Sequence, residues 1–115
     1  MPRKSIFDMR FGDVYALLVQ KAERKGRTRA EVAALAAWLT GYSQEELASL
    51  AESGASYGAF LENAPAYNPR AELITGKVCG VQVESIEDPL MKRVRQLDKL
   101  VDELSKGRPL EKIMR

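Results

Sequence analysis

Two helix-start signals fifteen residues apart constrain the fold of this chain more than any other feature. The segments 28–31, Thr-Arg-Ala-Glu, and 43–46, Ser-Gln-Glu-Glu, both match the capping box. In this motif a hydroxyl side chain accepts a hydrogen bond from the third helical amide, and the glutamate accepts one from the cap amide. Gly41 stands where a left-handed residue would end the first helix. The sequence therefore predicts a helix over 29–40, a tight turn, and a second helix over 44–52.

The clearest single element is a long helix near the C-terminus. Asp88 supplies a cap, Pro89 fits the first helical position, and Gly107 provides the stop. Apolar residues recur along it at spacings of four and three: Leu90, Val94, Leu97, Val101 and Leu104. This pattern predicts one continuous apolar face, which packs either inside the monomer or against a second copy of the chain.

Three shorter helices complete the expected set. A first helix over 14–25 would have Asp13 as its cap, and a short helix would follow Ser56. A last turn is expected after Pro109. Residues 1–12 are expected to be extended or partly disordered.

The segment from Arg70 to Ile86 is ambiguous, because its residues satisfy two patterns. Five residues of the segment follow helical spacing: Leu73, Ile74, Lys77, Val78 and Val81. Gly76 and Gly80 each weaken a helix by about 1 kcal/mol, and β-branched residues are frequent here. We favour a helix broken near Gly80, with one short extended piece near residues 78–84 as the alternative.

Together these elements predict an all-α fold of about five or six short helices. The 115 residues fit a single domain over 1–115. A chain of this length can bury roughly two-thirds of its unfolded surface, which suffices for a core without disulfides.

The absent residue types exclude several chemistries. The sequence has no histidine, which removes histidine-based nucleophile pairs and the common zinc-binding helix motif. Its one cysteine, Cys79, is interpreted as a small buried hydrophobe, with a nucleophile near Lys77 as the less favoured alternative. We expect no cofactor and no metal. There is no secretory signal and no apolar stretch long enough for a membrane span, so a cytoplasmic location is expected.

A helix-turn-helix DNA-binding function is one hypothesis. Ala37, Gly41 and Leu47 have the spacing of that motif, and residues 21–29 hold five cations that could neutralise phosphates. The expected recognition helix, 44–52, carries three acids and no base, so it would repel the DNA backbone. DNA is therefore the least favoured of the partners considered.

A ligand-binding surface is a second hypothesis. The side chains expected to form it are Arg24, Lys25, Arg27, Arg29, Trp38 and Tyr42. Aromatic side chains with Arg27, Arg29 or Arg70 could bind an anionic or aromatic small molecule; those considered are Trp38, Tyr42, Tyr57 and Tyr67. The alternative is that these aromatics only close the borders of a small helical core.

Several strings also resemble one bacterial family. They are Lys21–Thr28, Ala37–Tyr42, Asn68–Pro69, Val78–Val81, Ile86–Met91 and Leu97–Leu104. Together they are similar to the uncharacterised proteins grouped as domain of unknown function 2200, over nearly the whole chain. The resemblance implies a bacterial source and a compact, mainly helical orthogonal bundle. It implies no activity, so it supplies no functional residues.

The function favoured at this point is a small non-enzymatic interaction module. Its partner would be another protein or a second copy of the same chain. A small-molecule binder or an enzyme of unknown reaction is the first alternative, and a DNA binder is the second.

Overall fold

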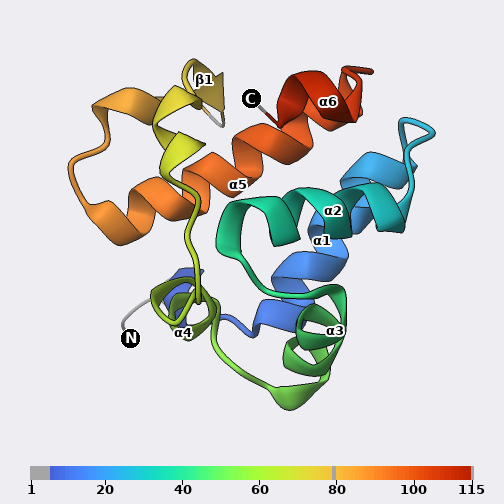
Figure 1. The fold of residues 1–115 in the computed structure, drawn as a ribbon, viewed down its shortest axis with the longest axis vertical. Coiled ribbons are helices and arrows are strands. Elements are labelled where there is room, and N and C mark those ends of the chain that lie inside the picture. The colour runs from blue at the N-terminus through green and yellow to red at the C-terminus, as the bar shows by residue number, and fades with distance from the viewer. Residues whose placement is uncertain (1–5, 79, 115) are drawn as a thin grey trace.

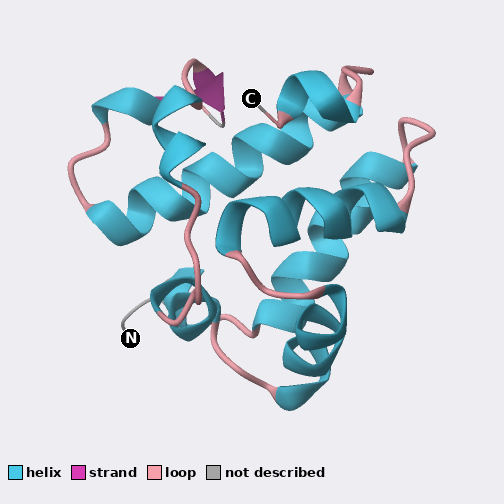
Figure 2. Ribbon diagram, viewed as in Figure 1, coloured by secondary structure: helices cyan, strands magenta, loops and turns pink. Residues whose placement is uncertain are grey.

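The computed structural model describes residues 6–78 and 80–114, and this part of the chain is mostly helical (Figure 2). Its α-helices are α1 (Phe11–Glu23), α2 (Arg29–Thr40), α3 (Gln44–Ser53), α4 (Tyr57–Glu62), α5 (Pro89–Ser105) and α6 (Leu110–Ile113). Short 3₁₀ turns are η1 (Ile6–Asp8), η2 (Pro69–Leu73) and η3 (Val83–Ser85). Strands β1 (Lys77–Val78) and β2 (Val81–Gln82) form a small antiparallel pair. The expected all-α class is confirmed.

The helix–turn–helix unit forms as the two capping boxes and Gly41 predict. Thr28 and Ser43 each accept a hydrogen bond from the third helical amide, at 3.2 and 3.1 Å, and both glutamates bond back to the cap amides. Gly41 has φ 84°, and an added Cβ there would lie 2.7 Å from the Ala66 side chain. Glycine is therefore required at this turn both for its backbone conformation and for close packing.

Helix α5 supplies one wall of the core. Asp88 caps it by accepting from the Leu90 amide at 3.1 Å, and Pro89 occupies the first helical position. The helix contacts α1, α2, α4 and the β1 strand (Figure 1). Its buried apolar side chains are Val94, Leu97, Leu100, Val101 and Leu104. The apolar face therefore packs inside the chain.

Stacked aromatic rings join the N-terminal helices. The Phe60 ring of α4 lies 3.9 Å from the Phe11 ring of α1 and 5.0 Å from the Tyr42 ring, measured between centroids. The Tyr42 hydroxyl also donates to the Phe60 carbonyl at 2.8 Å. Tyr57 is fully buried beside them, and its hydroxyl has no hydrogen-bond partner within the described residues. This cluster fixes α1 and α4 to the start of α3.

The predicted start of the first helix is wrong by three residues. Helix α1 begins at Phe11 after an extended Arg10, and it ends at Glu23. The Phe11 amide donates to the Ala55 carbonyl at 2.7 Å, and the Tyr57 amide donates to the Met9 carbonyl at 2.7 Å. This bridge to the α3–α4 turn holds Arg10 in an extended conformation directly before the helix, which begins without a side-chain cap. Residues 6–8 form η1 rather than an extended segment, whereas residues 1–5 lie outside the description.

The favoured helix over 70–86 is also wrong, and the extended alternative is confirmed. The segment forms η2, the β1–β2 pair with Val78 opposite Val81, and η3. Gly76 has φ 101° and Gly80 has φ 76°, and neither angle fits a right-handed helix. The interpretations of Cys79 concern a residue outside the described part of the chain.

None of the described helices combines the length and the apolar character that crossing a membrane requires.

Candidate functional site

The six residues of the predicted binding surface lie in two separate places. Arg24, Lys25 and Arg27 surround the α1–α2 turn, and the Arg29 guanidinium lies 5.5 Å from the centroid of the Tyr15 ring. Trp38 and Tyr42 lie at the other end of α2, about 14 Å along the helix axis at about 1.5 Å per residue. The structure therefore brings the cations together but does not bring the aromatic pair to them.

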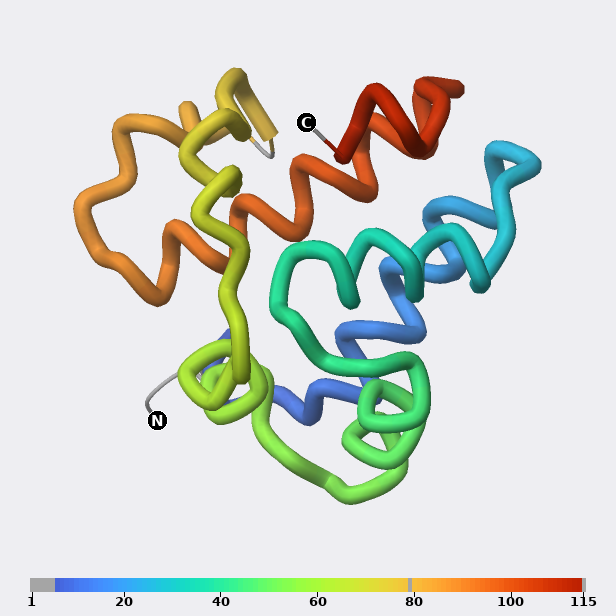
Figure 3. Tube along the Cα trace, in the orientation of Figure 1, coloured from blue at the N-terminus to red at the C-terminus, as the bar shows by residue number. Residues whose placement is uncertain are grey.

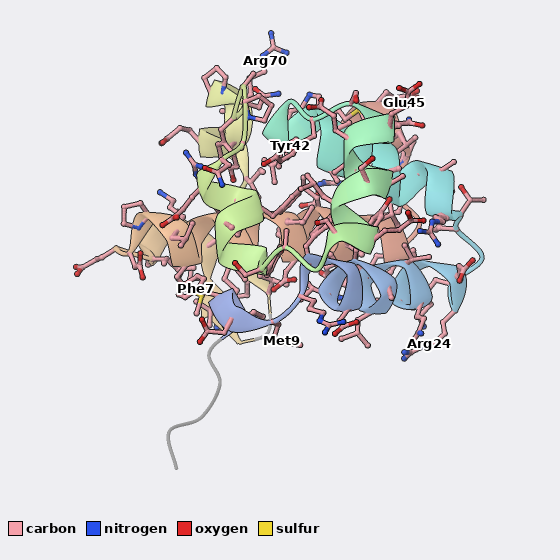
Figure 4. The ribbon with its side chains drawn as sticks, turned by 90° about the horizontal axis from the view of Figure 1, so that it is seen from below. Phe7, Met9, Arg24, Tyr42, Glu45 and Arg70 are labelled. Carbon is pink, nitrogen blue, oxygen red and sulfur yellow. The ribbon has the colours of Figure 1, made fainter. Side chains whose placement is uncertain are left out.

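The two aromatic residues have structural contacts of their own. Tyr42 is buried and bonds to Phe60, and the half-buried Trp38 packs against the core and accepts from Asn68 through its carbonyl. In Figure 4, Arg24 projects outward at the end of α1, whereas Tyr42 lies between α3 and α4. A ligand bridging these residues would have to span the length of α2.

A second cationic segment joins the first. The Arg27 guanidinium donates to the Arg108 carbonyl at 2.9 Å. Asp102 bridges the two segments, with Lys21 at 3.3 Å and Lys106 at 3.0 Å. Residues 21–29 and 106–112 consequently lie side by side, as the trace of the α1–α2 and α5–α6 turns shows (Figure 3). We call these two segments the basic end; they contain eight cations and two acids.

The basic end includes a shallow hollow of about 420 Å³ near the last turn of α5. Lys106 and Arg108 line it with largely exposed side chains, and Lys99 closes one side. The buried Glu103 pairs with Arg108 at 3.1 Å and holds that guanidinium at the rim. Exposed Lys and Arg side chains around a hollow are suited to binding carboxylates.

Arg27 also stabilises the capping box beneath the basic end. Its guanidinium lies 2.5 Å from the Glu31 carboxylate, and that hydrogen bond is the main reason why the pKa of Glu31 falls to about 2. Glu31 thus accepts bonds from both Arg27 and the Thr28 amide. These contacts tie the α1–α2 turn to the first turn of α2.

The Glu31→Gln substitution is expected to lower the free energy of unfolding at neutral pH by about 1 kcal/mol, because the cap and its ion pair are weakened. The carboxylate pKa is lower in the folded chain than its ordinary value of 4.5, so its contribution is complete above pH 4.5 and is lost as the pH falls towards 2. Urea unfolding across this range should therefore show the difference between parent and variant shrinking. A difference that stays constant would contradict the assignment. Glu46→Gln is the control, because it weakens the other capping box, at Ser43, where the glutamate forms no ion pair with a described residue. It measures the effect of the weakened cap alone at neutral pH.

The opposite charge dominates the middle of the chain. Residues 30–69 contain five acids and no lysine or arginine. Three of these acids, Glu45, Glu46 and Glu52, are exposed on α3, which is the helix that would read DNA in a helix-turn-helix protein. Helices α2 and α3 are joined by a tight turn, but the acids exposed on α3 are unfavourable next to DNA phosphates.

The carboxylates before α5 have structural roles. Glu84 accepts from Gln82 at 2.7 Å and from the Gly76 amide at 3.0 Å, and its pKa is lowered mainly by the bond from Gln82 and further by the bond from Gly76. Asp88 caps α5. Within residues 6–78 and 80–114, no group of acidic, cysteine and histidine side chains is arranged to hold a metal ion.

Comparison with known proteins gives the family of the chain. The model of an uncharacterized protein family conserved in bacteria, DUF2200, matches residues 5–115. The chain belongs to the DUF2200 family. A solved relative, the crystal structure of uncharacterized protein SP1917, is 41% identical, with a TM-score of 0.91 over 97% of this chain and 93% of that one. No curated protein matches the sequence. The solved relative shares the fold of this DUF2200 chain, and neither comparison names an activity.

The sequence shows only half of the basic end. Residues 21–29 are visibly cationic, but Lys106 and Arg108 are separated from them by about eighty positions. The available signal was the group of cations around Gly107, namely Lys106, Arg108 and Lys112, and its meaning depends on the contact with Arg27.

Proposed function

We propose that this protein is a non-enzymatic interaction module whose basic end binds an acidic segment of a partner protein. The observation that supports this is the contact between Arg27 and Arg108, which brings together two distant segments that hold eight cations. Such a field attracts acidic partners and raises the rate of productive encounter. The proposed location is the cytoplasm, because the single cysteine allows no disulfide within the chain.

An acidic protein fits this surface better than DNA does. The cations of the basic end alternate with carboxylates, since Glu31, Asp102 and Glu103 pair with Arg27, Lys21, Lys106 and Arg108. A DNA backbone favours an unbroken series of cations, and the net charge of +2 is small for a nucleic-acid binder. A protein segment can place single acidic side chains between these pairs.

A second copy of the chain is one partner of this kind. Its α3 would offer Glu45, Glu46 and Glu52, all of which are exposed. Sedimentation of the protein alone at low ionic strength tests this case. A mass that rises with protein concentration would show that a second copy of the chain is a partner. A mass that stays monomeric would mean that the partner is a different acidic protein.

The test of the proposal is fluorescence anisotropy with a labelled glutamate-rich peptide and a labelled mixed-sequence DNA duplex. We expect saturable peptide binding that weakens as salt is added. Arg24→Glu combined with Lys25→Glu should reduce the peptide affinity about tenfold or more, because both side chains are exposed at the basic end. Arg10→Glu combined with Lys77→Glu is the matched control, since it makes the same charge change at exposed positions elsewhere.

Two results would overturn the proposal. One is equal loss of affinity in the basic-end variant and in its matched control, which would show that net charge alone governs binding. The other is tighter binding of the duplex than of the peptide at the same ionic strength, which would favour nucleic acid as the partner.

A further inference from the structure

A cleft of about 360 Å³ lies beside the first half of α5, distant along that helix from the basic end. Residues 67–72 form one wall, and the 89–96 stretch of α5 forms the other. Figure 1 shows the chain after α4 running across this part of α5. The volume is at the small end of the range for ligand sites, which is about 300–1,000 Å³.

Two adjacent cations line this cleft without carboxylate partners. Lys92 and Arg93 are both half-buried, and neither forms an ion pair with any described residue. The other half-buried cations with acidic partners are Lys21, Arg27 and Arg95, which pair with Asp102, Glu31 and Asp98. Lys99, also half-buried and without an ion pair to a described residue, donates instead to the Lys77 carbonyl at 3.3 Å. What distinguishes the cleft is that two half-buried cations without ion pairs to described residues are adjacent in its lining.

Neither of the two nearby acids forms an ion pair with Lys92 or Arg93. The charge of Lys92 contributes to the lowered pKa of Glu84, but the two groups lie beyond ion-pair distance. Glu72 lines the cleft, yet it is exposed and pairs with neither cation. Its position disfavours ligands with many negative charges and offers a partner to an amino or hydroxyl group.

Arg93 is held in a fixed position. Its guanidinium carbon lies 4.0 Å from the centroid of the Tyr67 ring, and one terminal nitrogen donates to the Leu61 carbonyl at 2.7 Å. A guanidinium has five N–H donors, so most of them remain without a partner among the described residues. A planar, immobilised guanidinium of this kind binds carboxylate or phosphate through two parallel hydrogen bonds.

The wall opposite α5 is also rigid. The Tyr67 hydroxyl donates to the buried Gln96, whose amide nitrogen donates to the Ala71 carbonyl at 3.3 Å. Asn68 ties the same loop to α2 through the Trp38 carbonyl at 3.1 Å. A preformed cleft needs little ordering when a ligand enters, so more of the interaction energy is available for affinity.

We infer that this cleft binds a small oxyanion, the carboxylate or phosphate group of a small molecule, between Lys92 and Arg93. The ligand replaces the carboxylate that these two half-buried cations lack. This site is separate from the basic end and involves none of its residues.

The test uses the full chain and three probes: sodium phosphate, sodium acetate and, at matched ionic strength, sodium chloride. Amide chemical shifts in ¹H–¹⁵N spectra report where each probe acts. We expect saturable shifts confined to residues 67–72 and 89–96 with phosphate or acetate. Tighter binding of phosphate identifies a phosphorylated ligand, and tighter binding of acetate identifies a carboxylate. Equal, unsaturable shifts with all three salts would overturn the inference.

Variants separate the site from general charge effects. Lys92→Gln should weaken the probe about tenfold, because one charge-assisted contact is lost. We expect its fold to be retained, since the ammonium forms no hydrogen bond or ion pair with a described residue. Lys112→Gln removes the same charge from α6, outside the cleft, and should leave affinity unchanged. Arg93→Lys keeps the charge but removes the planar fork, and it should also weaken binding. Equal weakening in Lys92→Gln and Lys112→Gln would contradict the site.

Discussion

The Phe60→Ala substitution is expected to lower the free energy of unfolding by about 3–5 kcal/mol. Phe60 is almost completely buried, and its ring stacks on Phe11 at 3.9 Å and on Tyr42 at 5.0 Å. Alanine would leave a cavity where α1, α4 and the start of α3 meet. Small proteins are stable by only about 5–15 kcal/mol, so this loss is a large share of the total.

Urea unfolding followed by circular dichroism measures the effect, with Tyr57→Phe as the control. That variant keeps an aromatic ring in the same cluster and removes a buried hydroxyl that has no partner among the described residues. We expect its stability to be unchanged or slightly higher. A loss below about 1.5 kcal/mol for Phe60→Ala would show that the aromatic cluster is not essential to the core.

The Gly12→Ala substitution is expected to destabilise the protein by about 2 kcal/mol, although alanine favours a helix by about 1 kcal/mol over glycine. A Cβ at position 12 would lie 2.2 Å from the carbonyl oxygen of Ala51, a backbone atom of α3. Relief of this overlap requires α1 and α3 to separate. The steric cost therefore exceeds the gain in helix propensity.

The same urea unfolding measurement tests whether Gly12→Ala lowers or raises the free energy of unfolding. Ala16→Gly, at an exposed position of the same helix, calibrates the propensity effect without a clash and should cost about 1 kcal/mol. If Gly12→Ala proved more stable than the parent chain, the close approach of α1 and α3 would be wrong.

Elements defined by local chemistry were predictable from the sequence. The capping boxes at Thr28 and Ser43 and the Asp88–Pro89 start of α5 depend on contacts within one turn, and all three form. The start of α1 was missed because a backbone bridge to the α3–α4 turn, rather than a cap, sets it. The segment with Gly76 and Gly80 was misassigned because apolar spacing alone does not reveal two left-handed backbone angles.

The functional surfaces depend on contacts that sequence spacing does not show. Residues 21–29 are recognisable as cationic, but their union with Lys106 and Arg108 arises only in the folded chain. That Lys92 and Arg93 form no ion pair with a described residue is likewise a three-dimensional property. The basic end and the cleft are recognised by which charged side chains lie next to one another in the folded chain, and not by how many charged residues the sequence contains.

The position of α5 has a consequence for synthesis on the ribosome. The nascent chain presents α1, α2 and α4 before the helix that covers their apolar sides has been translated. Those sides stay open to chaperones and to other unfinished chains until residues 89–105 leave the exit tunnel. The fold is therefore completed only after α5 has been synthesised, and a product truncated before Pro89 would leave these apolar sides uncovered.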